Sequence, residues 1–199
     1  MVVKRLIFIF IFNFRLNAYI LLKRTSYKMI LEINKRFDEK LKDLNNSLPK
    51  LKVNVNCAEL TLTSVLEVLG IDNYVFHNAA IPLAGGFGGY KSKNGWQGAC
   101  GAVCGGCAAI GVTMGGKKRM DNETMIKAYL KAAKFASEFE KEFGSVVCTE
   151  LCGYDFSQPE VIIEYRNSGT WEKKCYHYVV WAVDHVRKFT QLELKDKWK

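Results

Sequence analysis

GGFGGYKSKNGWQGACGAVCGGCAAIGVTMGG, residues 85–116, is the stretch around which the rest of this sequence is organised. It holds twelve of the sixteen glycines and three of the seven cysteines. Glycine has no Cβ, so it lets a second backbone or a cofactor come close, and it accepts left-handed turns. Glycines this dense around thiols favour sulfur chemistry. Small residues dominate from about 98 to 112 and predict a tightly packed helix that starts near Cys100.

The flanking sequence predicts a mainly α protein. A chain of 199 residues with 49% hydrophobic residues is long enough for one domain with a real core and rather short for two. Only three prolines interrupt it. Apolar residues recur at helical spacing in four segments, 29–44, 58–69, 122–143 and 174–192. We therefore expect a single-domain multi-helix bundle with a Gly/Cys-rich central loop and helix.

Shorter segments complete this prediction. Residues 146–153 read as a short helix, and a short helix or strand is expected near 159–165. Residues 74–80 read as a short segment that ends before Pro82 and the glycine-rich loop.

The net charge of +9 is concentrated at the amino end. Residues 1–28 carry six basic residues and no acidic one, which leaves 23 basic and 20 acidic residues in the rest. The body has no basic stripe interleaved with aromatics, so we expect no nucleic-acid partner. The apolar run at 6–12 is shorter than the roughly 20 residues that span a bilayer. Residues 1–28 are thus a basic, apolar extension: a mis-called start, a membrane-surface anchor or a signal. Residues 29–199 form the domain.

Four cysteines fall at or near the starts of four predicted helices: Cys57, Cys100, Cys148 and Cys175. The first follows Asn56 in a sequence close to a capping box. The amides and dipole of a first helical turn favour a thiolate. If these starts converge, the four thiols would form the arrangement that an iron–sulfur cluster or zinc requires.

The same residues give the chain a family resemblance. The ordered motifs, each weak alone, are Asn56-Cys57-Ala58-Glu59, Gly86-Phe87-Gly88-Gly89, Cys100-Gly101-Ala102-x-x-Gly105, Phe143-Gly144-Ser145 leading to Cys148, Gly153-Tyr154-Asp155, and Cys175 before a final helix. This set, from about residue 56 to 187, resembles the C_GCAxxG_C_C-type redox-active proteins, a mostly helical prokaryotic group. It is also similar to the non-haem part of split-Soret cytochromes, whose cysteines are associated with an iron–sulfur centre.

The resemblance implies a particular ligand set. Cys57, Cys100, Cys148 and Cys175 would be the four family cysteines, with Gly88 and Gly89 in the loop that lets backbone amides or a partner approach the cofactor. Gly106-Cys107-Ala108-x-x-Gly111 offers a second register for the central cysteine. The chain has no Cys-x-x-Cys-His sequence, so covalent haem attachment does not carry over.

Three cysteines depart from the family pattern: Cys104, Cys107 and Cys152. They are extra metal ligands, a redox pair or packing thiols. In a thiol-relay alternative, Cys100 or Cys104 is the nucleophile and a neighbour such as Cys107 resolves the mixed disulfide.

The sequence therefore predicts an iron–sulfur protein of anaerobic electron transfer with an unidentified redox partner protein. Zinc in a structural module, or no metal, is the alternative. The odd number of cysteines and the lack of a convincing export signal favour the cytoplasm. Membrane contact is expected only through residues 1–28, and a homodimer stays open.

Overall fold

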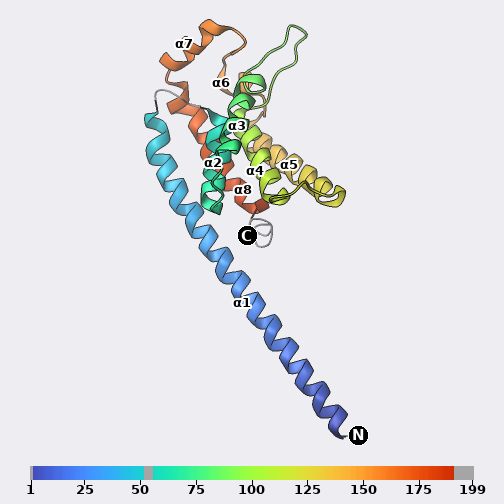
Figure 1. The fold of residues 1–199 in the computed structure, drawn as a ribbon. Helices are drawn as coiled ribbons and strands as arrows, with labels where there is room; N and C mark the ends of the chain where they lie inside the picture. The colour runs from blue at the N-terminus through green and yellow to red at the C-terminus, as the bar shows by residue number, and fades with distance from the viewer. Residues whose placement is uncertain (1, 52–55, 191–199) are drawn as a thin grey trace. The chain divides into compact units, whose positions relative to one another are not determined.

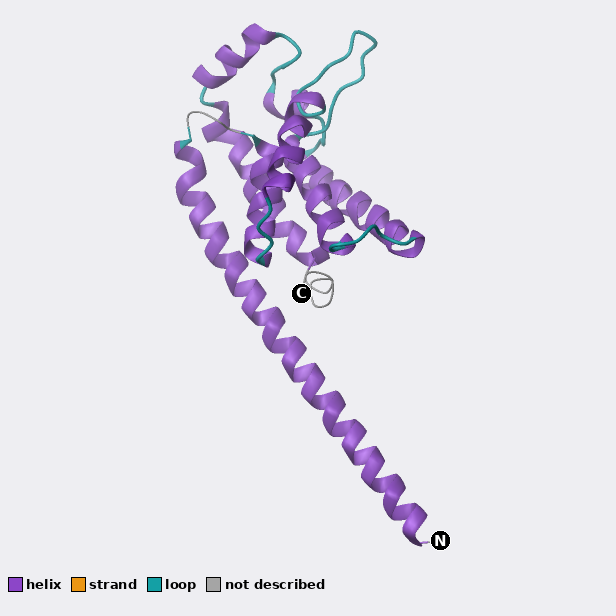
Figure 2. Ribbon diagram, viewed as in Figure 1, coloured by secondary structure: helices purple, strands orange, loops and turns teal. Residues whose placement is uncertain are grey.

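The computed structural model describes residues 2–51 and 56–190, and the mainly α prediction is confirmed (Figures 1 and 2). In these ranges there is no strand, and the two isolated antiparallel bridges join Lys91 to Gln97 and Ala99 to Val147. The elements are α1 (Val2–Ser47), the short 3₁₀ helix η1 (Leu48–Lys50), α2 (Cys57–Leu69), α3 (Tyr74–Gly86), α4 (Gly101–Gly115), α5 (Asn122–Phe143), α6 (Cys148–Cys152), α7 (Pro159–Asn167), the π-helical turn η2 (Trp171–Cys175) and α8 (Tyr176–Thr190).

The chain divides into two compact units, one that ends at Lys35 and one that begins at Arg36. The helix α1 runs through residue 28, where the sequence analysis placed the end of an extension, without a break. Its last turns belong to the second unit, where Phe37 is fully buried and Lys40 pairs with Glu67. Among the helices of the described part of the chain, none is long and apolar enough to cross a membrane.

Helices α2 and α4 form the centre of the second unit because glycines of α4 allow very close backbone contact. A Cβ on Gly105 would lie 2.4 Å from the Ala58 carbonyl oxygen, and one on Gly101 would lie 2.9 Å from the Cys57 Cβ. Real Cβ contacts are essentially never shorter than 3.0 Å, so only glycine fits at these two positions. The glycine-rich stretch is thus the surface by which α4 packs on α2.

Helix α5 packs on α4, whereas α3 and α8 each pack on both α2 and α4 (Figure 1). The ring of Phe135 packs on Gly106 of α4, where a Cβ would come within 2.4 Å of it. Val179, Val183 and Val186 of α8 are fully buried at α-helical spacing. The Asp121 carboxylate caps α5 by accepting from the Thr124 N–H at 2.7 Å. This core carries the elements that present the cysteines.

Two elements differ from the sequence prediction. Helix α3 continues through Pro82 to Gly86, whereas we expected the segment to end before this proline. The last helix begins with a π-helical turn, and α8 proper starts at Tyr176 rather than near 174. Residues 191 and 192 of the predicted last helix lie outside the described residues.

Candidate functional site

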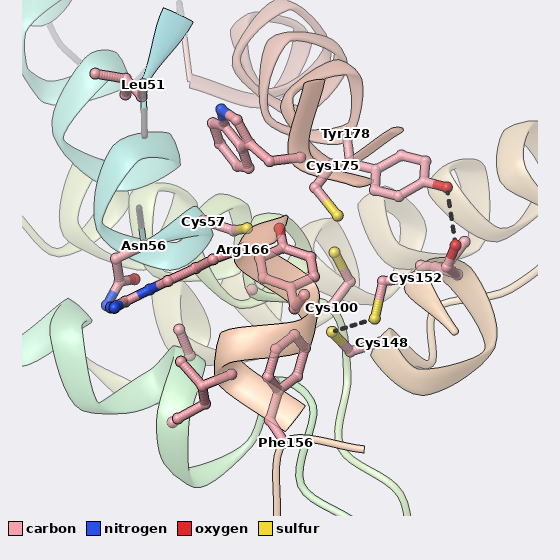
Figure 3. A pocket seen from close by; sticks show the side chains of 18 of the residues that line it. Leu51, Asn56, Cys57, Cys100, Cys148, Cys152, Phe156, Arg166, Cys175 and Tyr178 are labelled. Carbon is pink, nitrogen blue, oxygen red and sulfur yellow. Dashed lines mark hydrogen bonds between the residues drawn. The ribbon is translucent and has the colours of Figure 1, made fainter. Parts of the chain in front are cut away.

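Five of the seven cysteines line one pocket of about 390 Å³ (Figure 3). They are the four predicted by the family motifs, Cys57, Cys100, Cys148 and Cys175, and in addition Cys152. The sequence allows Cys152 to be an extra ligand, a redox thiol or a packing thiol, and the structure brings it to the same pocket. Its spacing of four from Cys148 on a helix was the available signal.

Cys57 is placed by the cap of α2. The Asn56 side chain accepts from the Glu59 N–H at 3.0 Å, so the helix begins with Cys57. The same amide donates to the Ile81 carbonyl at 2.9 Å, which ties this helix start to α3. Because Gly101 packs directly on Cys57, the residue before it, Cys100, is brought to the same pocket.

Cys100 and Cys148 are placed by a pair of backbone hydrogen bonds. The Cys100 N–H donates to the Val146 carbonyl at 2.7 Å, and the Cys148 N–H donates to the Gly98 carbonyl at 3.1 Å. A Cβ on Gly98 would lie 1.4 Å from the Phe87 carbonyl oxygen, so the loop can follow this path only with glycine there. The starts of α4 and α6, 47 residues apart in sequence, are thereby held side by side.

Cys175 is the last residue of the π-helical turn η2. The Trp171 indole at its start donates to the Leu48 carbonyl at 2.6 Å, which anchors the turn to η1, the short helix that follows α1. Burial raises the pKa of the Cys175 thiol, and the Tyr165 side chain of α7, which lines the same pocket, lowers it by a smaller amount. Single π-helical turns occur often at functional sites, because the extra residue re-aims the side chains around it.

Other pocket residues could not be read from cysteine motifs. Aromatic side chains of three different elements line the pocket, among them Tyr165, Trp171 and Tyr178, and Arg166 and Glu172 add charge. The Tyr178 hydroxyl donates to the Leu151 carbonyl at 3.4 Å, next to Cys152 (Figure 3). No periodicity or short motif distinguishes these aromatics from ordinary core residues.

The two predicted loop glycines play different parts. Gly88 lines the pocket. Gly89 instead has a left-handed φ of 78° and packs against the ring of Phe156, which lines the pocket. A Cβ on Gly89 would lie 2.2 Å from this ring. The Phe156 N–H donates to the Gly89 carbonyl at 3.0 Å. Gly89 therefore positions a wall of the pocket rather than forming part of it.

Burial is the largest influence on the acidity of three of the five pocket thiols. It raises the pKa of Cys57 well above its usual value, that of Cys100 to about 12 and that of Cys175 to about 11. Backbone N–H groups at the start of α4 lower the Cys100 pKa, as expected at a helix start, but by less than burial raises it. Desolvation therefore raises the Cys100 pKa by more than the helix start lowers it. These three thiols hold their protons at neutral pH.

Cys148 and Cys152 behave as a pair. Their sulfur atoms lie 4.0 Å apart and share a hydrogen bond. That hydrogen bond lowers the pKa of Cys152 to about 7 and raises the pKa of Cys148. Each of these two thiols therefore sets the acidity of the other.

Cys104 and Cys107 lie outside the pocket. Their thiols contact the carbonyl oxygens of Ala99 and Ala132, each at 3.9 Å. Burial raises both pKa values, that of Cys107 to about 11. The register that would put Cys107 in the ligand set thus places its thiol against α5, while Cys100 lines the pocket. A thiol relay through Cys104 and Cys107 would start from weakly acidic thiols.

The thiols surround the pocket without yet converging on a point. Within residues 2–51 and 56–190, no group of three or more His, Cys, Asp or Glu side chains is assembled closely enough to hold a metal ion. The donor chemistry fits iron or zinc, because both favour thiolate sulfur. Binding would require the side chains to rotate inward and release their protons.

A comparison with known protein families identifies the family of this chain. Residues 55–189 match the family described as "Putative redox-active protein (C_GCAxxG_C_C)". The match covers more than half of the chain, and the chain belongs to this family. Neither the curated proteins nor the solved structures that were compared with the chain gave a match.

Proposed function

We propose that this protein binds an iron–sulfur cluster through Cys57, Cys100, Cys148 and Cys175 and transfers electrons. The observation that carries the proposal is that these four thiols, from four separate elements, line a single pocket. Membership of a redox-active family supports a redox role for them. When bound, the cluster would supply reversible one-electron chemistry.

The pocket suits a multi-atom inorganic group. A zinc ion held by four thiolates draws the sulfurs to about 2.3 Å from one point and leaves no cavity. The volume of about 390 Å³ is larger than one closed ion needs. Gly85 and Gly88 line the pocket, and in a wall without side chains backbone amides can approach cluster sulfurs. Such hydrogen bonds and the surrounding burial set a cluster's potential.

The pocket residues of this chain would bind the metal through their sulfurs and shield it from water. The high thiol pKa values mean that Cys57, Cys100 and Cys175 give up protons when they bind metal. The Tyr165 side chain lowers the pKa of the Cys175 thiol against the effect of burial, which favours release of that proton to a metal. Trp171 and Phe156 cover the pocket with aromatic carbon and limit the access of water.

Electrons need a route to a partner protein, and we place it at the loop between α3 and α4. Trp96 lies edge-on to Phe87 and tilted against Tyr90, with ring centroids 5.9 and 5.7 Å apart, and each of the three rings is between 41% and 50% exposed. Gly88 of the same loop lines the thiol pocket. Exposed aromatic side chains are enriched at protein interfaces.

The test is anaerobic purification followed by a visible spectrum before and after dithionite. We expect a thiolate-to-iron absorption band near 400 nm that bleaches on reduction. Cys57→Ser should weaken or abolish the band, whereas Cys107→Ser, a substitution outside the pocket, should retain it. A colourless protein would refute the iron–sulfur assignment. One zinc per chain would then indicate the structural module.

A further inference from the structure

Helix α6 is a single turn with a cysteine at each end, Cys148 and Cys152. Residues four apart on a helix lie on the same face. Helix dimensions put their Cα atoms about 6 Å apart, inside the usual range for a disulfide. Their sulfurs, already in contact at 4.0 Å, need to close to about 2 Å for a bond. Side-chain rotation of this pair is the main change required.

We propose that Cys148 and Cys152 form a thiol–disulfide exchange site that is distinct from the cluster chemistry. One thiolate of the pair attacks a sulfur of a small disulfide, R–S–S–R, breaks its S–S bond and displaces the first R–S⁻, which leaves a mixed disulfide between the protein sulfur and the other R–S group. The second thiolate then attacks the protein sulfur of that mixed disulfide and displaces the second R–S⁻. The two cysteine protons leave with the two R–SH products. The protein pair is oxidised by two electrons, and the small disulfide is reduced by two.

The surroundings of α6 permit this closure. The helix has five residues and ends at Gly153, whose φ of 84° is left-handed. The Cys152 thiol also contacts the Tyr154 carbonyl at 3.7 Å, a weak hydrogen bond that disulfide formation would replace. Cys148 is half-buried and lines the pocket, so a small disulfide can approach it from there.

The competing dithiol of the sequence, Cys104-Gly-Gly-Cys107, is arranged differently. Its two sulfurs contact carbonyl groups of different segments, Ala99 in the loop before α4 and Ala132 in α5. The pair on α6 is the one with a sulfur–sulfur contact of 4.0 Å. Closing it would also remove Cys148 from the proposed cluster ligands, so the disulfide and a cluster exclude each other.

The test uses the full-length chain, shown by metal analysis to be metal-free, and oxidised glutathione as the disulfide. Trypsin releases residues 142–166 as one peptide, in which Cys148 and Cys152 are the cysteines. We expect this peptide to become lighter by two hydrogen atoms and to lose both of its alkylation sites. The tryptic peptide 94–117, with Cys100, Cys104 and Cys107, should keep its alkylation sites and serves as an internal control.

Two variants sharpen the test. In Cys152→Ser the second displacement cannot occur, so Cys148 should be trapped as a glutathione mixed disulfide. Cys104→Ser, the matched control, should form the internal disulfide as the wild type does. The proposal is overturned if wild-type peptide 142–166 stays fully alkylated, or if Cys148 is instead linked to Cys57 or Cys175. The wild-type peptide decides the matter even if a variant fails to fold. Since the protein is metal-free, the result does not depend on the cluster.

Discussion

Replacing Gly105 with alanine should separate the two helices that hold Cys57 and Cys100. The new Cβ would lie 2.4 Å from the Ala58 carbonyl oxygen and 2.8 Å from the Thr61 Cβ. Ordinary van der Waals contact begins near 3.4 Å, so α2 and α4 must move apart by about 1 Å. The closer of the two obstacles is backbone, which cannot rotate away as a flexible side chain would.

The magnitude follows from two opposing effects. Overpacking of a core costs about 1–3 kcal/mol, and a backbone obstacle puts Gly105→Ala near the upper end of that range. Alanine in a helix gains back up to about 1 kcal/mol relative to glycine. The net loss should be about 2 kcal/mol, or roughly 4–8 °C in Tm for a domain of this size.

Gly111→Ala is the matched control, because it lies on the same helix with nothing within 4 Å of its added Cβ. It should gain about 0.5–1 kcal/mol from helix propensity alone. Urea denaturation of both variants, followed by far-UV circular dichroism, measures the difference. If Gly105→Ala were as stable as Gly111→Ala, the close packing of α2 on α4 would be wrong.

Three further predictions concern the thiols and the loop. Because Cys57, Cys100 and Cys175 are protonated below pH 9, cobalt(II) affinity should rise about tenfold per pH unit for each proton released; a pH-independent affinity would contradict the raised pKa values. The metal-free chain should lose stability between about pH 9 and 12. The reason is that the thiols ionise near pH 9 in the unfolded chain, whereas the folded Cys175 and Cys100 keep their protons to about pH 11 and 12. Urea midpoints that do not change across this pH range would refute this prediction. Gly89→Ala should destabilise the chain by about 1–3 kcal/mol, because its Cβ meets Phe156. Gly95→Ala is the matched control, because Gly95 also has a positive φ but a Cβ there would meet no atom within 4 Å. Both variants carry backbone strain, so faster limited proteolysis of the loop in Gly89→Ala than in Gly95→Ala would indicate the packing clash with Phe156.

The helices were predictable from sequence because their signals are local. Asn56 and Asp121 cap α2 and α5 as their side chains predict, and Gly70 and Gly144 end the same helices in left-handed conformations. The continuation of α3 through Pro82 was missed, since a proline usually ends a helix. The π-helical turn before α8 has no comparable sequence signal.

The candidate site was predictable only in part. Motif order selected Cys57, Cys100, Cys148 and Cys175, but their common pocket depends on backbone contacts between distant segments, such as the bridge from Ala99 to Val147. No local pattern encodes such a pairing. The thiol pKa values were also out of reach, because they depend on burial. Helix starts suggested stabilised thiolates, whereas desolvation keeps most of these thiols protonated.

The iron and acid-labile sulfide content of the anaerobically purified chain decides whether the cysteine pocket holds a cluster. We expect both elements in stoichiometric amounts per chain, and their loss when Cys57 or Cys175 is replaced by serine. Iron and sulfide absent from the wild-type protein, or unchanged in those two variants, would contradict it.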